Sequence, residues 1–228
     1  DANIRNAVFA EMGITDPLVK SKLTAIINDT SITSDTILQN KLTAELGSVF
    51  EMTPSQIETV YKAKVVGYVN AAKSLSGLPY SDELIALSSL RFNGLYGTTA
   101  SPTLVASLNL SDPHEARAEA WYQIRYIHAD QLHKRRYIEA ELFGLYGDAG
   151  TVTEDMAKGV LRMYTRHRKD AVSNGSAANM LAYDQSHAAQ ITQANKDITK
   201  INENLIAAGF LGITNNVQSL ELELKKAK

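Results

Sequence analysis

The chain contains no cysteine among its 228 residues, so it has neither disulfides nor a thiolate for catalysis. It also has no apolar run of about 18 residues, the length of a membrane-spanning helix, and we expect no membrane insertion. Its 23 basic residues nearly balance its 25 acidic ones, which gives a net charge of −2. Because that balance leaves no global positive field, nucleic-acid binding is not expected.

Strand patterns are scarce as well, since apolar residues recur at helical spacing and do not alternate along the chain. The five histidines form neither an HExxH pattern nor a pair four residues apart, so we expect no metal site. No glycine-rich phosphate loop is present, and we expect no cofactor. The sequence therefore predicts an all-α fold.

Helix starts are marked clearly along the chain. Asp16 precedes Pro17, which suits an N-cap followed by proline in the first turn. Residues 53–56 (TPSQ) have the pattern of a capping box, in which a hydroxyl and a glutamine three residues later cap one another. Similar signals predict further helices after Ser81, Ser101, Asp112 and Thr153.

The C-terminal part of the sequence has a different pattern. Apolar residues follow a narrow 3–4–3–4 stripe, typical of a coiled coil, at Ile191, Ala194, Ile198, Ile201 and Leu205. We therefore predict a helical domain over residues 1–150 and a helical extension, packed on it, over residues 151–228.

The first five residues lack an initiator methionine, and they lack the basic lead and apolar stretch of a signal peptide. We expect that the chain is either processed or cut from a larger protein.

Residues 84–147 resemble the C-terminal lobe of phage-type lysozymes. The resemblance lies in the order of four segments: an "xALxSxxFN" helix, an "STLLxxLN" helix, an Ala/Trp helix and an "RRxxExxLF" helix. Here the first, second and fourth read ALSSLRFN, SPTLVASLN and RRYIEAELF, and Trp121 lies in the third. The resemblance implies a lysozyme-like helical scaffold.

Residues 9–47 resemble the N-terminal part of all-helical endolysins and of type VI secretion lysozyme effectors. Residues 12–17 (MGITDP) match the family's "FGIxxP" opening, and an apolar helix follows. The family then has a Gly-His-Glu-Ser turn and, nine residues later, a Glu-Asn pair. Aligned this way, Thr30 and Gln39 occupy the positions of the two carboxylates.

That departure bears directly on catalysis. Glycoside hydrolysis needs an acid on the leaving oxygen and a second carboxylate across the ring, and neither threonine nor glutamine can act as the acid. Three other carboxylates are candidates: Asp29 beside Thr30, Asp35 six residues after Asp29, and Glu11, which ends the first helix as the phage-type catalytic glutamate does. The alternatives are that Asp29 and Asp35 are ordinary caps and that Glu11 is a solvated surface residue.

Other polar and aromatic residues are candidates for sugar binding. Trp121 and Arg125 share a helix face and could stack on a sugar and hydrogen-bond to it. Asn93 and Tyr96 follow the first motif of the resemblance and could line the same cleft, as could Thr30 and Gln39 if they face it. The alternative for Trp121 is core packing.

The resemblance implies a peptidoglycan glycoside hydrolase, a muramidase, acting as an endolysin or an antibacterial effector that is secreted or delivered to the periplasm. Its expected partners are peptidoglycan glycan strands, with an immunity protein or a secretion-system component as a possible second partner. The alternative is a catalytically inactive lysozyme-like module that binds peptidoglycan or a protein.

Overall fold

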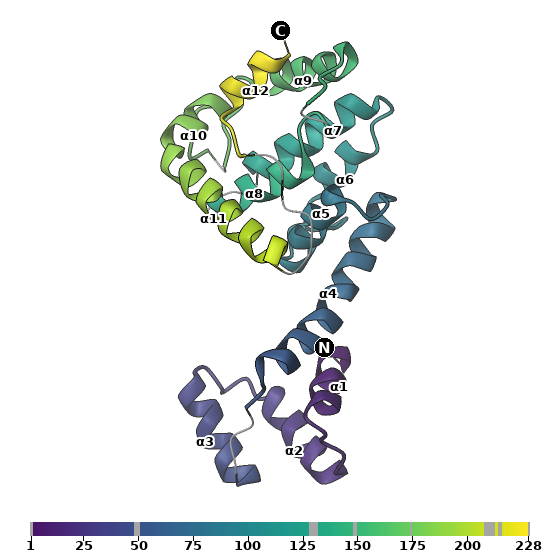
Figure 1. Cartoon of the computed structure of the whole chain (residues 1–228), viewed down its shortest axis with the longest axis vertical. Helices are drawn as coiled ribbons and strands as arrows, with labels where there is room; N and C mark the ends of the chain where they lie inside the picture. Colours follow the sequence, from purple (N-terminus) through teal and green to yellow (C-terminus); the bar gives the residue numbers. More distant parts are fainter. Residues whose placement is uncertain are drawn as a thin grey trace. The chain divides into compact units, whose positions relative to one another are not determined.

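The computed structural model describes residues 2–47, 51–127, 132–147, 150–173, 175–207, 213 and 216–227 (Figure 1). Within these ranges the chain is helical and has no β-strand, and one isolated antiparallel bridge pairs Val172 with Ala177. The all-α prediction is confirmed. No helix in the described ranges is both long and apolar enough to cross a membrane.

The chain divides into two compact units, Asp1–Gly67 and Tyr68–Lys228. The first unit contains three helices and the start of a fourth: α1 (Ala2–Glu11), α2 (Pro17–Ile27), α3 (Asp35–Leu46) and α4 (Pro54–Ser76), which crosses the border between the units. Its core is small and consists of one cluster of buried side chains: Phe9, Ile14, Leu23, Ile26 and Leu42.

The predicted caps start these helices. The Asp16 side chain accepts a hydrogen bond from the Leu18 amide at 2.7 Å, which satisfies a donor that α2 leaves free. At the start of α4, the Gln56 amide donates to the Thr53 hydroxyl at 3.3 Å, and the Thr53 amide donates to the Gln56 side chain at 2.9 Å. This is the reciprocal capping box that residues 53–56 predicted.

The second unit holds the remaining elements: α5 (Asp82–Phe92), α6 (Pro102–Leu108), α7 (Pro113–Tyr122), the π-helix η1 (Gln123–Ile127), α8 (His133–Phe143), α9 (Glu154–His167), α10 (Met180–Ser186), α11 (Ala188–Ala207) and α12 (Leu220–Lys226). The helix predicted to start after Asp112 thus continues into a wider π turn, with its side chains buried.

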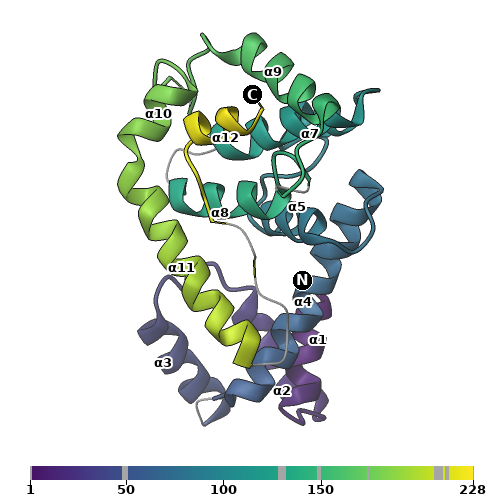
Figure 2. The same ribbon diagram turned by 45° about the horizontal axis from the view of Figure 1, so that its top comes forward.

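Residues 151–228 share one core with residues 68–150. Helix α9 packs along α7, and α11 packs along α8 (Figure 1, Figure 2). Buried side chains of the two parts, such as Trp121 and Met163, belong to the same hydrophobic cluster. The predicted boundary near residue 150 therefore does not coincide with a division between compact units, because both sides of it bury their apolar faces together.

The stripe predicted on the C-terminal helix packs on this core and not in a coiled coil. Ala194 and Ile198 of α11 are buried in the main cluster, and Ile191 packs against it, whereas Ile201 is largely exposed. The Leu205 side chain lies outside the described residues. The narrow apolar face thus covers one side of α8.

Candidate functional site

Glu11 is the last residue of α1, where its own backbone is tied to the start of α4. The Gln56 side-chain amide donates to the Glu11 carbonyl oxygen at 2.6 Å, across 45 residues of sequence. The Glu11 side chain is half-buried and, among the described residues, forms no hydrogen bond or ion pair. The hydrogen bond from Gln56 thus fixes the backbone at Glu11 beside the start of α4.

Asp29 occupies the turn between α2 and α3 and is already engaged. Its Oδ1 accepts hydrogen bonds from the Ser31 amide at 2.9 Å and the Ser31 hydroxyl at 2.6 Å, and its Oδ2 forms an ion pair with Lys41. These donors stabilise the ionised carboxylate. Asp29 is therefore better suited to stabilise positive charge than to donate a proton.

The other predicted residues of the first unit are exposed. Asp35 lies in the first turn of α3, where a negative charge favours the helix dipole, and Ser34 is the N-cap. Gln39 is exposed on the same helix, and Thr30 is exposed in the preceding turn. None of these three side chains is buried.

Asn93 and Tyr96 follow α5 and serve the local fold. The Asn93 side-chain amide donates to the Ser89 carbonyl oxygen at 2.5 Å, which closes the end of α5. Tyr96 has no exposed surface, and burial raises its pKa to about 12. As placed, Tyr96 has no face that a sugar could reach.

Trp121 and Arg125 are buried together inside the second unit. The Arg125 guanidinium lies 4.9 Å from the Trp121 ring, and it donates to Asp184 of α10 at 2.9 Å and to the Gln218 carbonyl oxygen at 2.7 Å. The Leu220 amide also donates to Asp184, at 2.7 Å. This arrangement agrees with the core-packing alternative for Trp121, and it fastens the C-terminal segment to η1.

Two motifs of the resemblance meet where α5 packs on α8. The Ser89 hydroxyl donates to Glu139 at 2.5 Å, and Arg135 donates to the same carboxylate oxygen at 3.2 Å and to Ser89 at 3.1 Å. The fully buried Arg136 guanidinium lies 2.7 Å from the other oxygen of Glu139 as an ion pair, outside hydrogen-bond geometry. Burial raises the pKa of Glu139, although both arginines oppose the rise.

No family model, curated protein or solved structure matches the chain. The assignment of a site therefore rests on geometry and chemistry alone.

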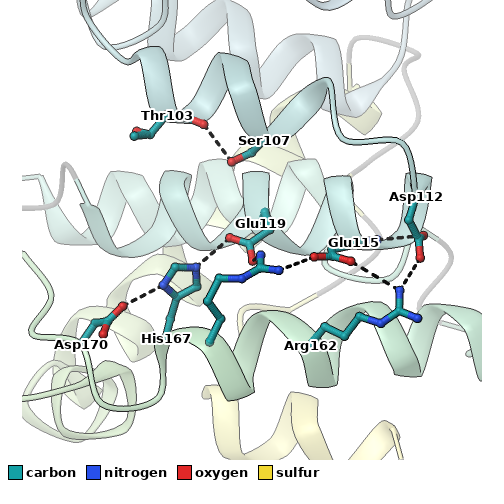
Figure 3. A network of polar contacts seen from close by, with 9 residues as sticks. Thr103, Ser107, Asp112, Glu115, Glu119, Arg162, His167 and Asp170 are labelled. Carbon is teal, nitrogen blue, oxygen red and sulfur yellow. Dashed lines mark hydrogen bonds and ion pairs between the residues drawn. The ribbon is translucent and has the colours of Figure 1, made fainter.

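A histidine between two carboxylates joins α7 to α9 (Figure 3). His167 Nε2 lies 2.8 Å from Glu119, its Nδ1 lies 2.9 Å from Asp170, and its ring stacks on Tyr122 at 4.0 Å. Both contacts are hydrogen bonds to ionised carboxylates only when both ring nitrogens carry protons. Burial opposes that charge, but the hydrogen bonds to Glu119 and Asp170 outweigh it and raise the pKa of His167.

Arginines of α9 extend this network along the same interface (Figure 3). Arg162 pairs with Asp112 at 2.6 Å, and Arg166 pairs with Glu115 at 2.5 Å and also with Glu119. The basic side chains on this face of α9 thus meet acidic partners of α7. The whole network serves to hold two helices together.

A second acid of α8, which is half-buried, lies beside α12. Glu141 of α8 and Glu223 of α12 line a cavity of about 20 Å³, which has room for one water molecule. Burial, together with the negative charge of Glu223, raises the pKa of Glu141 to about 7. Glu223 itself pairs with Lys226 at 3.0 Å. A cavity of this size does not admit a sugar.

No group of three or more histidine, aspartate and glutamate side chains in the described ranges could hold a metal ion. Sequence reasoning missed Glu141, Glu139 and His167 as titratable groups with shifted pKa values. Burial by other helices raises the pKa of the two glutamates, and the hydrogen bonds to Asp170 and to Glu119, which lies 48 residues away, raise the pKa of His167. Among the predicted carboxylates of the first unit, Glu11 is half-buried without an ion pair in the described residues, and Asp29 is held by Ser31 and Lys41.

Proposed function

We propose that this chain is a peptidoglycan glycoside hydrolase, a muramidase, with Glu11 as its general acid. The observation that carries the proposal is the placement of Glu11: it ends α1, is half-buried, and is tied to the start of α4 by Gln56. In the described residues the Glu11 carboxyl group forms no ion pair. This agrees with the phage-type resemblance, in which the catalytic glutamate ends the first helix.

Asp29 supplies the second carboxylate in this proposal. Hydrolysis passes through a transition state with positive charge on the sugar ring, and an ionised carboxylate stabilises that charge. Lys41 and Ser31 hold the Asp29 side chain in one orientation. The proposed enzyme is secreted or delivered to the periplasm, as an endolysin or an antibacterial effector, with peptidoglycan glycan strands as its substrate.

The test is whether the chain clears a suspension of purified cell walls, measured as a fall in turbidity. The released fragments are identified by mass. We expect Glu11→Gln to reduce the clearing rate by about 10²–10⁴-fold, the usual contribution of general acid catalysis. Glu58→Gln makes the same chemical change on an exposed residue of α4 that forms an ion pair with Lys62, and it should clear at the normal rate.

A second function is favoured by one observation: Thr30 and Gln39, where the aligned family has its carboxylates, are both exposed and neither can titrate. An inactive module would bind peptidoglycan or a protein without cutting a bond. Intact chain that clears no wall at any pH, yet sediments with insoluble peptidoglycan, would contradict the muramidase and support this module.

A further inference from the structure

A groove lies between α1 and α2 within the first unit. It has a volume of about 570 Å³ and is formed entirely by residues 5–24. This size matches a pocket for a small ligand, which typically holds about 300–1,000 Å³. A whole protein surface would need a broader contact, about 800 Å² on each side.

The floor of the groove is apolar. Phe9 and Ile14, both buried members of the small core, contribute to it, and Pro17 forms part of the wall. Gly13 stands at the turn with a φ of +63°, and a Cβ built there would meet nothing within 4 Å. The groove is therefore open at Gly13 and presents apolar surface to a ligand.

Two cations line this apolar surface, and no acidic residue does. Arg5 of α1 and Lys20 of α2 are both half-buried, and within the described part of the chain neither forms an ion pair. In the same unit, by contrast, Lys22, Lys41 and Lys62 each have an acidic partner. Arg5 and Lys20 thus leave two positive charges uncompensated beside an apolar floor, in a chain whose net charge is negative.

We propose that this groove binds a short anionic peptide with small apolar side chains, which is the chemistry of a peptidoglycan stem peptide. The two cations bind its carboxylates, and the floor of Phe9 and Ile14 packs against its alanine methyl groups. The choice of stem peptide rests on the function proposed above. The groove would hold the chain on the wall through the peptide while the glycan strand is cut elsewhere.

The test is calorimetric titration of the full chain with the free tetrapeptide L-Ala-γ-D-Glu-meso-diaminopimelyl-D-Ala. We expect Arg5→Gln and Lys20→Gln each to weaken binding roughly tenfold, because each removes one charge-assisted contact. Lys62→Gln, which removes an exposed cation of α4 outside the groove, should bind normally. Circular dichroism of each variant verifies its fold, and either groove variant alone suffices for the test.

Two further probes decide the chemistry. The same tetrapeptide with its carboxylates amidated should not bind measurably, and an all-L acidic tetrapeptide of equal charge should bind at least tenfold more weakly. Equal binding of the amidated peptide would overturn the role of the cations, and equal binding of the all-L peptide would overturn the stem-peptide assignment. Unchanged affinity in both groove variants would remove the site altogether.

The proposal that the groove binds a stem peptide and the proposal that the chain is a muramidase can fail independently. The free tetrapeptide has no glycosidic bond, so its binding is measured without any hydrolysis. A chain that clears no wall but binds the peptide through Arg5 and Lys20 keeps the groove and loses the enzyme. A chain that clears walls but does not bind the peptide keeps the enzyme and loses the groove.

Discussion

Gly159 of α9 lies where the backbones of α9 and α7 come closest. A Cβ at this position would lie 2.6 Å from the His114 carbonyl carbon and 2.9 Å from the Glu115 amide nitrogen. Both atoms belong to the backbone of a packed helix and cannot move aside as a flexible side chain would. The residue is therefore required by the close approach of the two helices, although glycine weakens a helix by itself.

Gly159→Ala should lower the free energy of unfolding of the second unit by about 2 kcal/mol, because a methyl group is forced into a filled space. Gly67→Ala is the matched control: Gly67 also lies within a helix, α4, and a Cβ there meets nothing within 4 Å. That variant should gain about 0.5–1 kcal/mol. Urea unfolding measures both, and equal stability of the two variants would contradict the close approach.

Helices α7 and α9 are joined by contacts of unequal strength. The pair between Arg162 and Asp112 is about half-exposed, and such pairs contribute about 0–1 kcal/mol. His167 and Glu119 are much less exposed, and their contact is charged on both sides only while the histidine is protonated. The interface between the two helices therefore depends on pH mainly through His167.

We expect the second unit to lose stability as the pH rises above about 6.5. The pKa of His167 is raised in the folded chain, so its contribution is complete below the unfolded pKa of about 6.5 and disappears as the pH passes the folded pKa. Melting temperatures of wild type and His167→Gln across this range test it, and the variant should have the flatter profile.

Glu141 has to be separated from His167 in that experiment. Its pKa, raised to about 7, means that the folded chain binds the extra proton above pH 4.5, so its contribution also declines with rising pH. Both measurements are therefore repeated in a Glu141→Gln background. In that background, melting temperatures that change equally with pH in the chain with His167 and in the chain with His167→Gln would show that His167 does not couple α7 to α9.

At the scale of the whole molecule, two hydrophobic cores of very different size lie in two compact units. Among the described residues, the first unit buries five apolar side chains around Ile26, whereas the cluster around Leu87 draws on every helix from α4 to α12. The small core buries little apolar surface per ordered residue, and for this reason small domains have only a small free energy of unfolding. We infer that the first unit is the less stable of the two.

Scanning calorimetry should therefore show two transitions, the first belonging to residues 1–67. Ile26→Ala should lower only the first midpoint and Leu87→Ala only the second, because each deletion removes about 2–5 kcal/mol from its own core. A single transition that both substitutions lower equally would mean that the two units unfold as one.

Local signals placed most of the helices, and the resemblance named Glu11 and Asp29 as candidates, but neither showed what packs around those side chains. The caps at Asp16 and Thr53 predicted their helices because they act within one turn. The prediction that residues 151–228 form an extension used the stripe of α11 alone, and that stripe could not reveal which partner it covers. The alternatives for Trp121 were open for the same reason, since a helix face does not show what packs against it.

By itself the sequence determined the helical class, the starts of the helices and the absence of thiol chemistry, because each depends on residue type or on neighbours a few positions apart. Only the tertiary structure decided where the compact units divide, that Arg125 pairs with Asp184 across 59 residues, and which acids have a raised pKa. Burial and charge pairing depend on which distant segments share a core, and no local pattern encodes that choice.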